Sequence, residues 1–275
     1  MSAAIPYRQQ LAGRAVLVIV MLVTVLPLLS LLSTALQPQG SVPTGLSWPA
    51  HPHWHNFADA WTSANMLALL RSSLVVVLGV VPLSVLIATM AAYGITQLRI
   101  VGGRALFALF LLGLTIPVEA AMVPLYLELR DLGLLNTRWA LILPLIGLYM
   151  PFSVFWMRAH FLNLPAELSE AADIDGASKG QAFRHIHVPL AVPAISSLAL
   201  LLFLWTWNQF LLAIVLIDDP TKRTMAGALG AFQGAHSNNI VLVCAGSLMI
   251  IAPAVVVFLF LQRHFVKALL QSAAK

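Results

Sequence analysis

The residues whose types and spacing could do chemistry are concentrated in one polar stretch between two long apolar runs. Asp173 and Asp175 precede Gly176 in a pattern that resembles part of a calcium loop. The glycine comes too early for such a loop, and the bidentate glutamate that would close it is missing. The following residues, GASKG at 176–180, lack the G-x-x-x-x-G-K-[S/T] spacing that cradles nucleotide phosphates. The stretch therefore predicts neither a calcium site nor an ATPase site.

Polar residues inside the apolar segments indicate where a solute could pass. Glu119 lies well within one such segment, where an ionised carboxylate costs about 3 kcal/mol, so we expect it to face protein, water or a partner chain. Trp205, Asn208 and Gln209 combine aromatic faces with amides. This chemistry suits sugars, because sugar rings stack on aromatic rings while their hydroxyls bond to amides. Lining of a solute pathway and structural packing remain open for both sets.

The composition assigns these residues to a membrane protein. Of the 275 residues, 60% are hydrophobic and 9% are charged, and the mean hydropathy is +0.91. One soluble core cannot bury that much apolar surface, so the surrounding solvent is largely lipid. The net charge is +5, but Lys and Arg are scattered at the ends of apolar segments, and nucleic acid is not an expected partner. We expect one membrane domain over residues 1–275, with no metal or cofactor of its own.

Six segments are long and apolar enough to cross the hydrocarbon core as helices, which takes about 20 residues each. We therefore predict an all-α membrane protein with spans at residues 15–36, 72–98, 105–127, 139–157, 188–217 and 240–261. The first exceeds the apolar run of a signal peptide and is interpreted as a retained anchor. The fifth is too long for a simple crossing, and its prolines suggest a kinked or discontinuous helix. Most Lys and Arg residues lie next to the span ends on one side of the membrane. This side also holds both termini and residues 163–187, which predicts that it is cytoplasmic.

Residues 163–187, between the fourth and fifth spans, predict two short helices joined by an elbow. Glu167 and Glu170 suit the positive end of a helix dipole, and Gly176 suits the left-handed conformation that often ends a helix. Ser178 and Gln181 have the spacing of a capping box for the second helix. Exposed alanines would let another backbone approach, and Glu170 offers a carboxylate to a partner arginine. An amphipathic hairpin on the inner membrane surface is the alternative interpretation.

The polar stretch also carries a family resemblance. EAADIDGASKGQAFRHIHVPLAVP, at 170–193, closely resembles the EAA loop of the membrane subunits of binding-protein-dependent ABC importers. Further segments are similar to the smaller permease of the maltose-type carbohydrate branch: IP at 116–117, PLY at 124–126, LGLLNT at 132–137, WNQF at 207–210, LGAF at 229–232 and QRHFV at 262–266. The resemblance covers most of the chain and puts the permease core at about 72–266.

This resemblance implies a set of partners and a role for each segment. It implies that residues 163–187 form a coupling helix that docks in a groove of a cytosolic ATPase through Glu170, Ala171, Ala172, Asp173, Gly176 and Ala177. The implied partners are a second permease that completes a heterodimer, two copies of the ATPase, which hold the ATP and Mg, and an extracytoplasmic substrate-binding protein. The complex would lie in a bacterial inner membrane. The loop with Leu229, Gly230, Phe232, Gln233 and Gly234 would face the binding protein, unless it is a flexible connector.

We therefore expect a permease subunit that admits a di- or oligosaccharide, a polyol or an amino sugar by alternating access. A non-sugar solute such as a glycerophosphodiester is an alternative within the same family. An ion-coupled secondary transporter should have internal repeats and paired intramembrane carboxylates, and the sequence displays neither. An enzyme would need a convergent acid, base or nucleophile, whereas Glu119 lies in a span without a histidine nearby in sequence.

Overall fold

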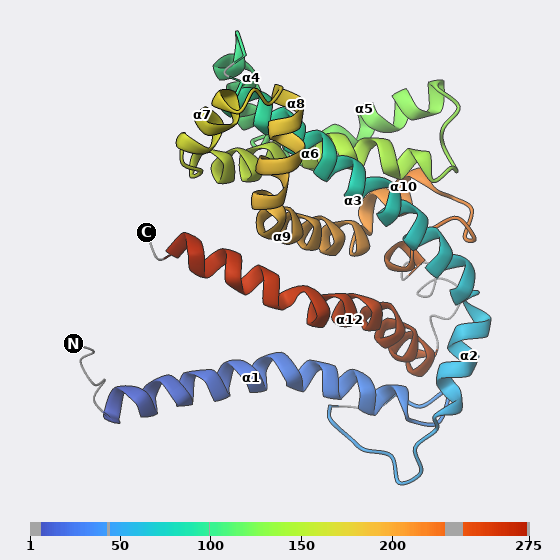
Figure 1. Cartoon of the computed structure of the whole chain (residues 1–275). Helices are drawn as coiled ribbons and strands as arrows, with labels where there is room; N and C mark the ends of the chain where they lie inside the picture. Colours follow the sequence, from blue (N-terminus) through green and yellow to red (C-terminus); the bar gives the residue numbers. More distant parts are fainter. Residues whose placement is uncertain (1–6, 43–44, 99, 229–238, 274–275) are drawn as a thin grey trace. The chain divides into compact units, whose positions relative to one another are not determined.

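The computed structural model describes residues 7–42, 45–98, 100–228 and 239–273 of the chain. Every regular element within these ranges is a helix, which confirms the all-α prediction (Figure 1). Five helices there are long and apolar enough to cross a membrane: Gly13–Ala35, Met66–Thr96, Trp139–Leu162, Lys179–Trp207 and Ile240–Phe260. A sharply bent helix pair brings the number of candidate spans to as many as six. The chain divides into two compact units, Met1–Met66 with Leu229–Ile251, and Leu67–Ala228 with Ala252–Lys275.

The first unit contains α1 (Tyr7–Ala35), α2 (His55–Ser63) and the beginning of α12 (Ile240–Ala273). Small residues let these helices approach, since Ala35, Ala60 and Ala245 are fully buried in one cluster. Asn56 is 2% exposed, and its Nδ2 donates to the carbonyl oxygens of Ala35 at 2.9 Å and Gln37 at 2.8 Å. These bonds satisfy carbonyls left free at the end of α1.

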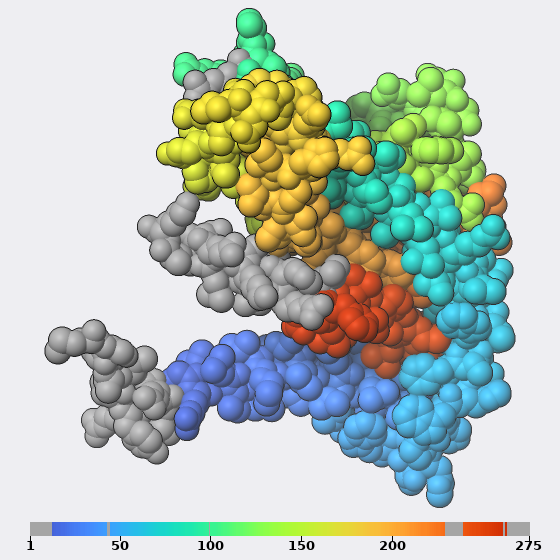
Figure 2. Space-filling view, in the orientation of Figure 1, coloured from blue at the N-terminus to red at the C-terminus, as the bar shows by residue number. Residues whose placement is uncertain are grey.

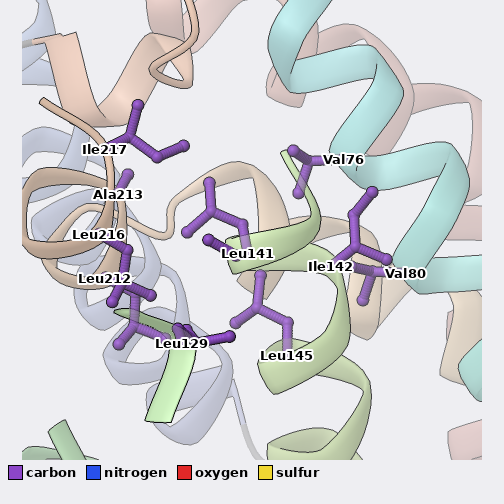
Figure 3. Packing of buried hydrophobic residues seen from close by; sticks show 11 residues of the cluster. Val76, Val80, Leu129, Leu141, Ile142, Leu145, Leu212, Ala213, Leu216 and Ile217 are labelled. Atoms are coloured by element: carbon purple, nitrogen blue, oxygen red, sulfur yellow. The ribbon is translucent and has the colours of Figure 1, made fainter. Parts of the chain in front are cut away.

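The core of the second unit lies between α3 (Met66–Thr96), α6 (Trp139–Leu162) and α10 (Leu211–Leu216). Figure 3 shows Leu141 and Leu145 of α6 between Val76 and Val80 of α3 on one side and the α10 residues on the other. The approach of α3 to α6 is close at Gly79, because a Cβ there would lie 2.9 Å from Cδ1 of Ile142. This packing fixes the helices that carry the polar residues discussed below.

The third predicted span is not one crossing helix, and the prediction of a continuous helix over residues 105–127 is wrong. The structure has α4 (Gly103–Gly113) and α5 (Val118–Asp131), bent by 99° at the break between them. Pro117 stands before α5 with an extended backbone (φ −69°, ψ 132°). A proline has no amide proton and disfavours the helical conformation of the preceding residue, which favours a break at Pro117, although Pro124 and Pro144 lie inside α5 and α6.

The fifth predicted span begins earlier and ends earlier than residues 188–217. A four-residue turn, α8 (Lys179–Ala182), continues through the π-helical η1 (Phe183–His187) into α9 (Val188–Trp207), so the second helix of the predicted elbow is the first part of this span. Residues 188–217 therefore form two helices, but the break follows α9, and the helix is not interrupted at Pro189 or Pro193, where the prediction expected a kink or break. Asn208 donates from Nδ2 to the carbonyl of Leu204, and Oε1 of Gln209 accepts from the amide of Leu212. Such side-chain bonds to the local backbone compete with helix continuation.

Candidate functional site

The elbow predicted around Gly176 is present and has a defined set of hydrogen bonds. Its first arm is α7 (Glu167–Ile174), and Gly176 follows with φ +72°. The amide of Ala177 donates to the carbonyl of Ala172 at 2.9 Å, and the amide of Gly176 donates to the carbonyl of Asp173 at 3.2 Å. These two bonds define the Schellman end of a helix, which requires a left-handed residue at the position of Gly176.

The second arm begins with the predicted capping box. The backbone amide of Ser178 donates to Oε1 of Gln181 at 2.8 Å, and the amide of Gln181 donates to Oγ of Ser178 at 3.3 Å. An ion pair that the sequence analysis missed joins the two arms, since Nζ of Lys179 lies 2.6 Å from Oδ1 of Asp173. Both side chains are at least half exposed, so the pair contributes only about 0.5 kcal/mol.

The two faces of α7 differ in composition. Glu170 and Ala171 are exposed on the outer face, as predicted, together with Ile174, which is 86% exposed at the tip of the elbow. Ala172 is only 3% exposed and packs inward, so its predicted place on the exposed face is wrong. Figure 2 shows α7 and the residues after it, in yellow, at the molecular surface. The outer face therefore combines exposed carboxylates with one exposed apolar side chain.

Aromatic side chains attach the elbow to the bundle. The ring of Tyr93, near the end of α3, lies 4.8 Å from that of Phe183 and 5.0 Å from that of His187. His187 also meets Phe161 of α6 edge-on at 6.2 Å. The hydroxyl of Tyr93 donates to the carbonyl of Lys179 at 3.1 Å. The second arm of the elbow therefore rests on the ends of α3 and α6.

Among the polar residues proposed for a solute pathway, Trp205 and Gln209 both adjoin Tyr149 of α6, whereas Glu119 lies on α5. Trp205 packs on Phe152 at 4.8 Å and Tyr149 at 5.6 Å while remaining 39% exposed, so packing and an accessible face coexist at this residue. Asn208 and Gln209 bond to nearby backbone at the break before α10. They follow Trp205 in the sequence by three and four residues.

Glu119 lies in the first turn of α5, directly after the 99° bend, and its side chain is exposed. A carboxylate in this place stabilises the free amides at the start of the helix. In the part of the chain that the structure describes, no hydrogen bond joins Glu119 to Trp205, Asn208 or Gln209. The loop residues Leu229, Gly230, Phe232, Gln233 and Gly234 lie outside the described residues.

Near the beginning of α3, long-range hydrogen bonds form a second polar centre, the Asn136 lock, which sequence reasoning did not find. Asn136 has φ +61°, and its amide donates to the carbonyl of Leu216 at 3.1 Å. Its Oδ1 accepts from the amides of Asp218 at 2.6 Å and Asp219 at 3.2 Å. Hydrogen bonds from Thr221 hold the pKa of the Asp219 carboxyl below its ordinary value.

Two serines of α3 complete the Asn136 lock. Nε of Arg138 donates to Oγ of Ser72 at 3.1 Å, and Ser72 donates to the carbonyl of Lys222. The amide of Met225 donates to Oγ of Ser73 at 2.8 Å. The only sequence signal was the LGLLNT segment at 132–137, which carries Asn136 but does not identify its partners.

Histidine, cysteine, aspartate and glutamate form no group of three or more suited to a metal ion within the described ranges. On α2, Nε2 of His55 lies 3.1 Å from the carboxylate of Asp59, which also accepts from Nε2 of Gln39 at 2.7 Å.

Comparison with known proteins identifies the class of this bundle. Residues 81–271 match the sequence model of a family described as "binding-protein-dependent transport system inner membrane component". The chain is 32% identical over 255 residues to the diacetylchitobiose uptake system permease protein NgcG of Streptomyces coelicolor, covering 92% of this chain and 84% of the relative. It is 32% identical over 251 residues to the melibiose/raffinose/stachyose import permease protein MelC of Bacillus subtilis, covering 91% of both.

A third relative, the trehalose transport system permease protein SugB of Mycobacterium tuberculosis, is 32% identical over 252 residues and covers 91% of this chain and 92% of the relative. The fold matches a chain in the crystal structure of a bacterial ABC transporter involved in the import of alginate, with a TM-score of 0.79 and 23% identity, covering 96% of this chain and 99% of that chain.

The helical fold and these matches define a multi-pass membrane transport subunit. The chain belongs to the family of binding-protein-dependent transport system inner membrane components. It is a permease subunit of an ABC importer in the inner membrane and not an enzyme.

Proposed function

We propose that this permease admits a carbohydrate, in the size range from disaccharide to oligosaccharide, and forms half of the pathway for it. Three relatives support this class of solute, because their names assign them to diacetylchitobiose, to melibiose, raffinose and stachyose, and to trehalose. The pairing of an accessible Trp205 face with the amides of Asn208 and Gln209 provides suitable chemistry. In this proposal Glu119 also lines the pathway, and residues 1–275 act as one permease domain.

The observation that carries the coupling role is the elbow itself. A well-bonded turn at Gly176 presents the outer face of α7, with Glu170, Ala171 and Ile174 exposed. We propose that this face docks in a groove of a separate cytosolic ATPase, where Glu170 pairs with a basic side chain and Ile174 enters an apolar recess. Asp173, Gly176 and Ala177 then hold the shape of the elbow, and Ala172 packs behind it.

In the complete importer, a second permease subunit forms a heterodimer with this chain, and two copies of the ATPase supply the ATP and Mg sites. An extracytoplasmic binding protein delivers the sugar to the side of the loop with Leu229, Gly230, Phe232, Gln233 and Gly234. Both termini and the elbow face the cytoplasm. Closure of the ATPases, transmitted through α7, would shift the balance between two arrangements of the bundle.

The test is copurification followed by uptake into vesicles. The tagged chain should bring down an ATPase and a second permease, and uptake of diacetylchitobiose, melibiose or trehalose should require ATP and the binding protein. Uptake driven by a proton or sodium gradient without the ATPase would overturn the importer mechanism. Uptake of a glycerophosphodiester with no sugar uptake would retain the mechanism and overturn the solute class.

A further inference from the structure

The inner face of α7 makes polar contacts with the bundle in addition to the aromatic ones. Ser169 lies three residues before the buried Ala172 and therefore on the same face of the helix. Its Oγ lies 3.1 Å from Oε1 of Gln97 and 3.2 Å from Nε2 of His187. Nε2 of Gln97 donates to the carbonyl of Phe161 at 3.0 Å. These four residues come from α7, the end of α3, η1 and α6.

The available protons fix the direction of each bond. Because Nε2 of Gln97 donates to Phe161, the Oε1 atom that faces Ser169 is an acceptor. Ser169 therefore donates its single hydroxyl proton to Oε1 of Gln97. Its Oγ then accepts from Nε2 of His187. Nδ1 of His187 has no hydrogen-bond partner within the described ranges, which fits a neutral ring protonated at Nε2 alone.

A π-helical turn places His187 against Ser169. In η1 the amide of Val188 donates to the carbonyl of Phe183, five residues back, where an α-helix would bond four residues back. The turn precedes Pro189, whose missing amide proton could not have served the α-helical ladder. The extra residue in this turn changes the direction in which the following side chains point. The His187 side chain is 1% exposed and packs beside Tyr93 and Phe161.

Two attachments are needed to orient a short helix. The Schellman turn and the Asp173–Lys179 pair hold only the C-terminal end of α7, about which the helix could pivot. Ser169 supplies a second attachment one turn nearer the N-terminus. Breaking it would leave polar groups of Gln97 and His187 unpaired in a largely apolar surrounding, which opposes pivoting.

We propose that Ser169, Gln97 and His187 form a positioning relay that makes α7 move as one body with the cytoplasmic-side ends of α3, α6 and α9. This inference rests on the proposed coupling function and adds the residues that transmit the force. Ser169 is a positioning residue, since its hydroxyl contacts neither ATP nor solute.

The first test compares transport with ATP hydrolysis in the complete importer. Ser169→Ala should leave ATPase copurification at the wild-type level, because the outer face of α7 is intact, while solute moved per ATP falls by about tenfold. Ser169→Thr, which keeps the hydroxyl, should recover the ratio to within about twofold. The matched control is Ser197→Ala, since Ser197 is 1% exposed and its hydroxyl, among the described residues, bonds only to the carbonyl of Pro193 in its own helix. An unchanged ratio in Ser169→Ala, or no recovery in Ser169→Thr, would overturn the relay.

The second test needs no ATPase. Nitrogen NMR of the detergent-solubilised chain labelled at histidine, with His187→Gln to assign the signal, should show His187 neutral, protonated at Nε2 and not at Nδ1. Ser169→Ala should shift that signal, whereas Ser197→Ala should not. A proton on Nδ1 would overturn the relay while leaving the importer mechanism intact. Failure of the wild-type chain to bind any ATPase would instead overturn the coupling function while leaving the NMR result standing.

Discussion

The elbow and the Asn136 lock contact opposite ends of α3. Hydrogen bonds hold both regions, but the bonds join different kinds of partners. At the elbow, a left-handed glycine closes a turn whose bonds join near neighbours, and one face of α7 stays exposed. At the Asn136 lock, a left-handed asparagine uses its side chain to hold the segment after α10, which is 82 residues away at Asp218. The elbow keeps a shape that a partner can contact, whereas the lock holds one segment of the bundle to another. Changes at the elbow should therefore affect coupling, and changes at the lock should affect stability.

The largest effect on coupling is expected for Gly176→Val. A β-branched residue cannot readily adopt φ +72°, and the strain exceeds the roughly 1–2 kcal/mol of an ordinary left-handed residue, so transport should fall at least about tenfold. Membrane insertion should be unchanged, because no span is altered. Vesicle uptake and membrane content measure the two effects. Gly180→Ala is the control, since its Cβ would meet nothing within 4 Å; full transport by Gly176→Val would show that the elbow conformation is unimportant.

Asn136→Ala should destabilise the bundle by about 2 kcal/mol, because the amides of Asp218 and Asp219 lose their acceptor. Thermal unfolding of the purified chain in detergent measures the change, and ATPase attachment should remain at the wild-type level. Asn163→Ala is the control, because in the described part of the chain the Asn163 side chain bonds only to the carbonyl of Ala159 in the adjoining α6. If the two variants unfolded at the same temperature as the wild type, the lock would not contribute to stability.

Glu170→Ala should weaken attachment to the ATPase by about fivefold, as expected for one exposed charge-assisted contact at an interface. A pull-down titrated with ATPase measures the loss, and it should diminish at high salt. Glu128→Ala, an exposed carboxylate on α5, should bind as the wild type does. Undiminished binding by Glu170→Ala would exclude this carboxylate as a docking contact.

The smallest effect is expected for Asp173→Asn, which removes the ion pair with Lys179. Because both partners are at least half exposed, the elbow should lose less than about 1 kcal/mol, and transport should change by no more than about twofold. Hydrogen exchange of the α7 amides at low and high salt measures the local loss. A loss as large as that of Gly176→Val would show that the ion pair, and not the turn, fixes the elbow.

The contrast between the two ends of α3 also explains which features the sequence could predict. Gly176, Ser178 and Gln181 act on residues three to five positions away, so their spacing is visible in the chain, and the turn and the capping box were predicted correctly although the second arm is continuous with the fifth span. Ser72 and Asn136 act on partners far along the chain, and no local pattern identifies them.

The helix breaks follow the same distinction. Hydropathy alone gave one crossing over 105–127, because apolar residues continue through the bend, and Pro117 alone could not mark the break, since Pro124 lies inside α5. The relay was not visible either, since Ser169 meets Gln97 only after α3 and α7 are packed together.

The bend before α5 restricts what can surround that part of the permease. The first amides of a helix have no acceptors within it, and hydrocarbon cannot supply any. The amides of Leu114, Thr115 and Ile116 donate to carbonyls of α4, so the first amides of α5 are the groups that must be shielded from acyl chains by another protein surface or by water. Acyl-chain photolabels should mark α1 and the exposed flank of α3 but leave this segment unmodified.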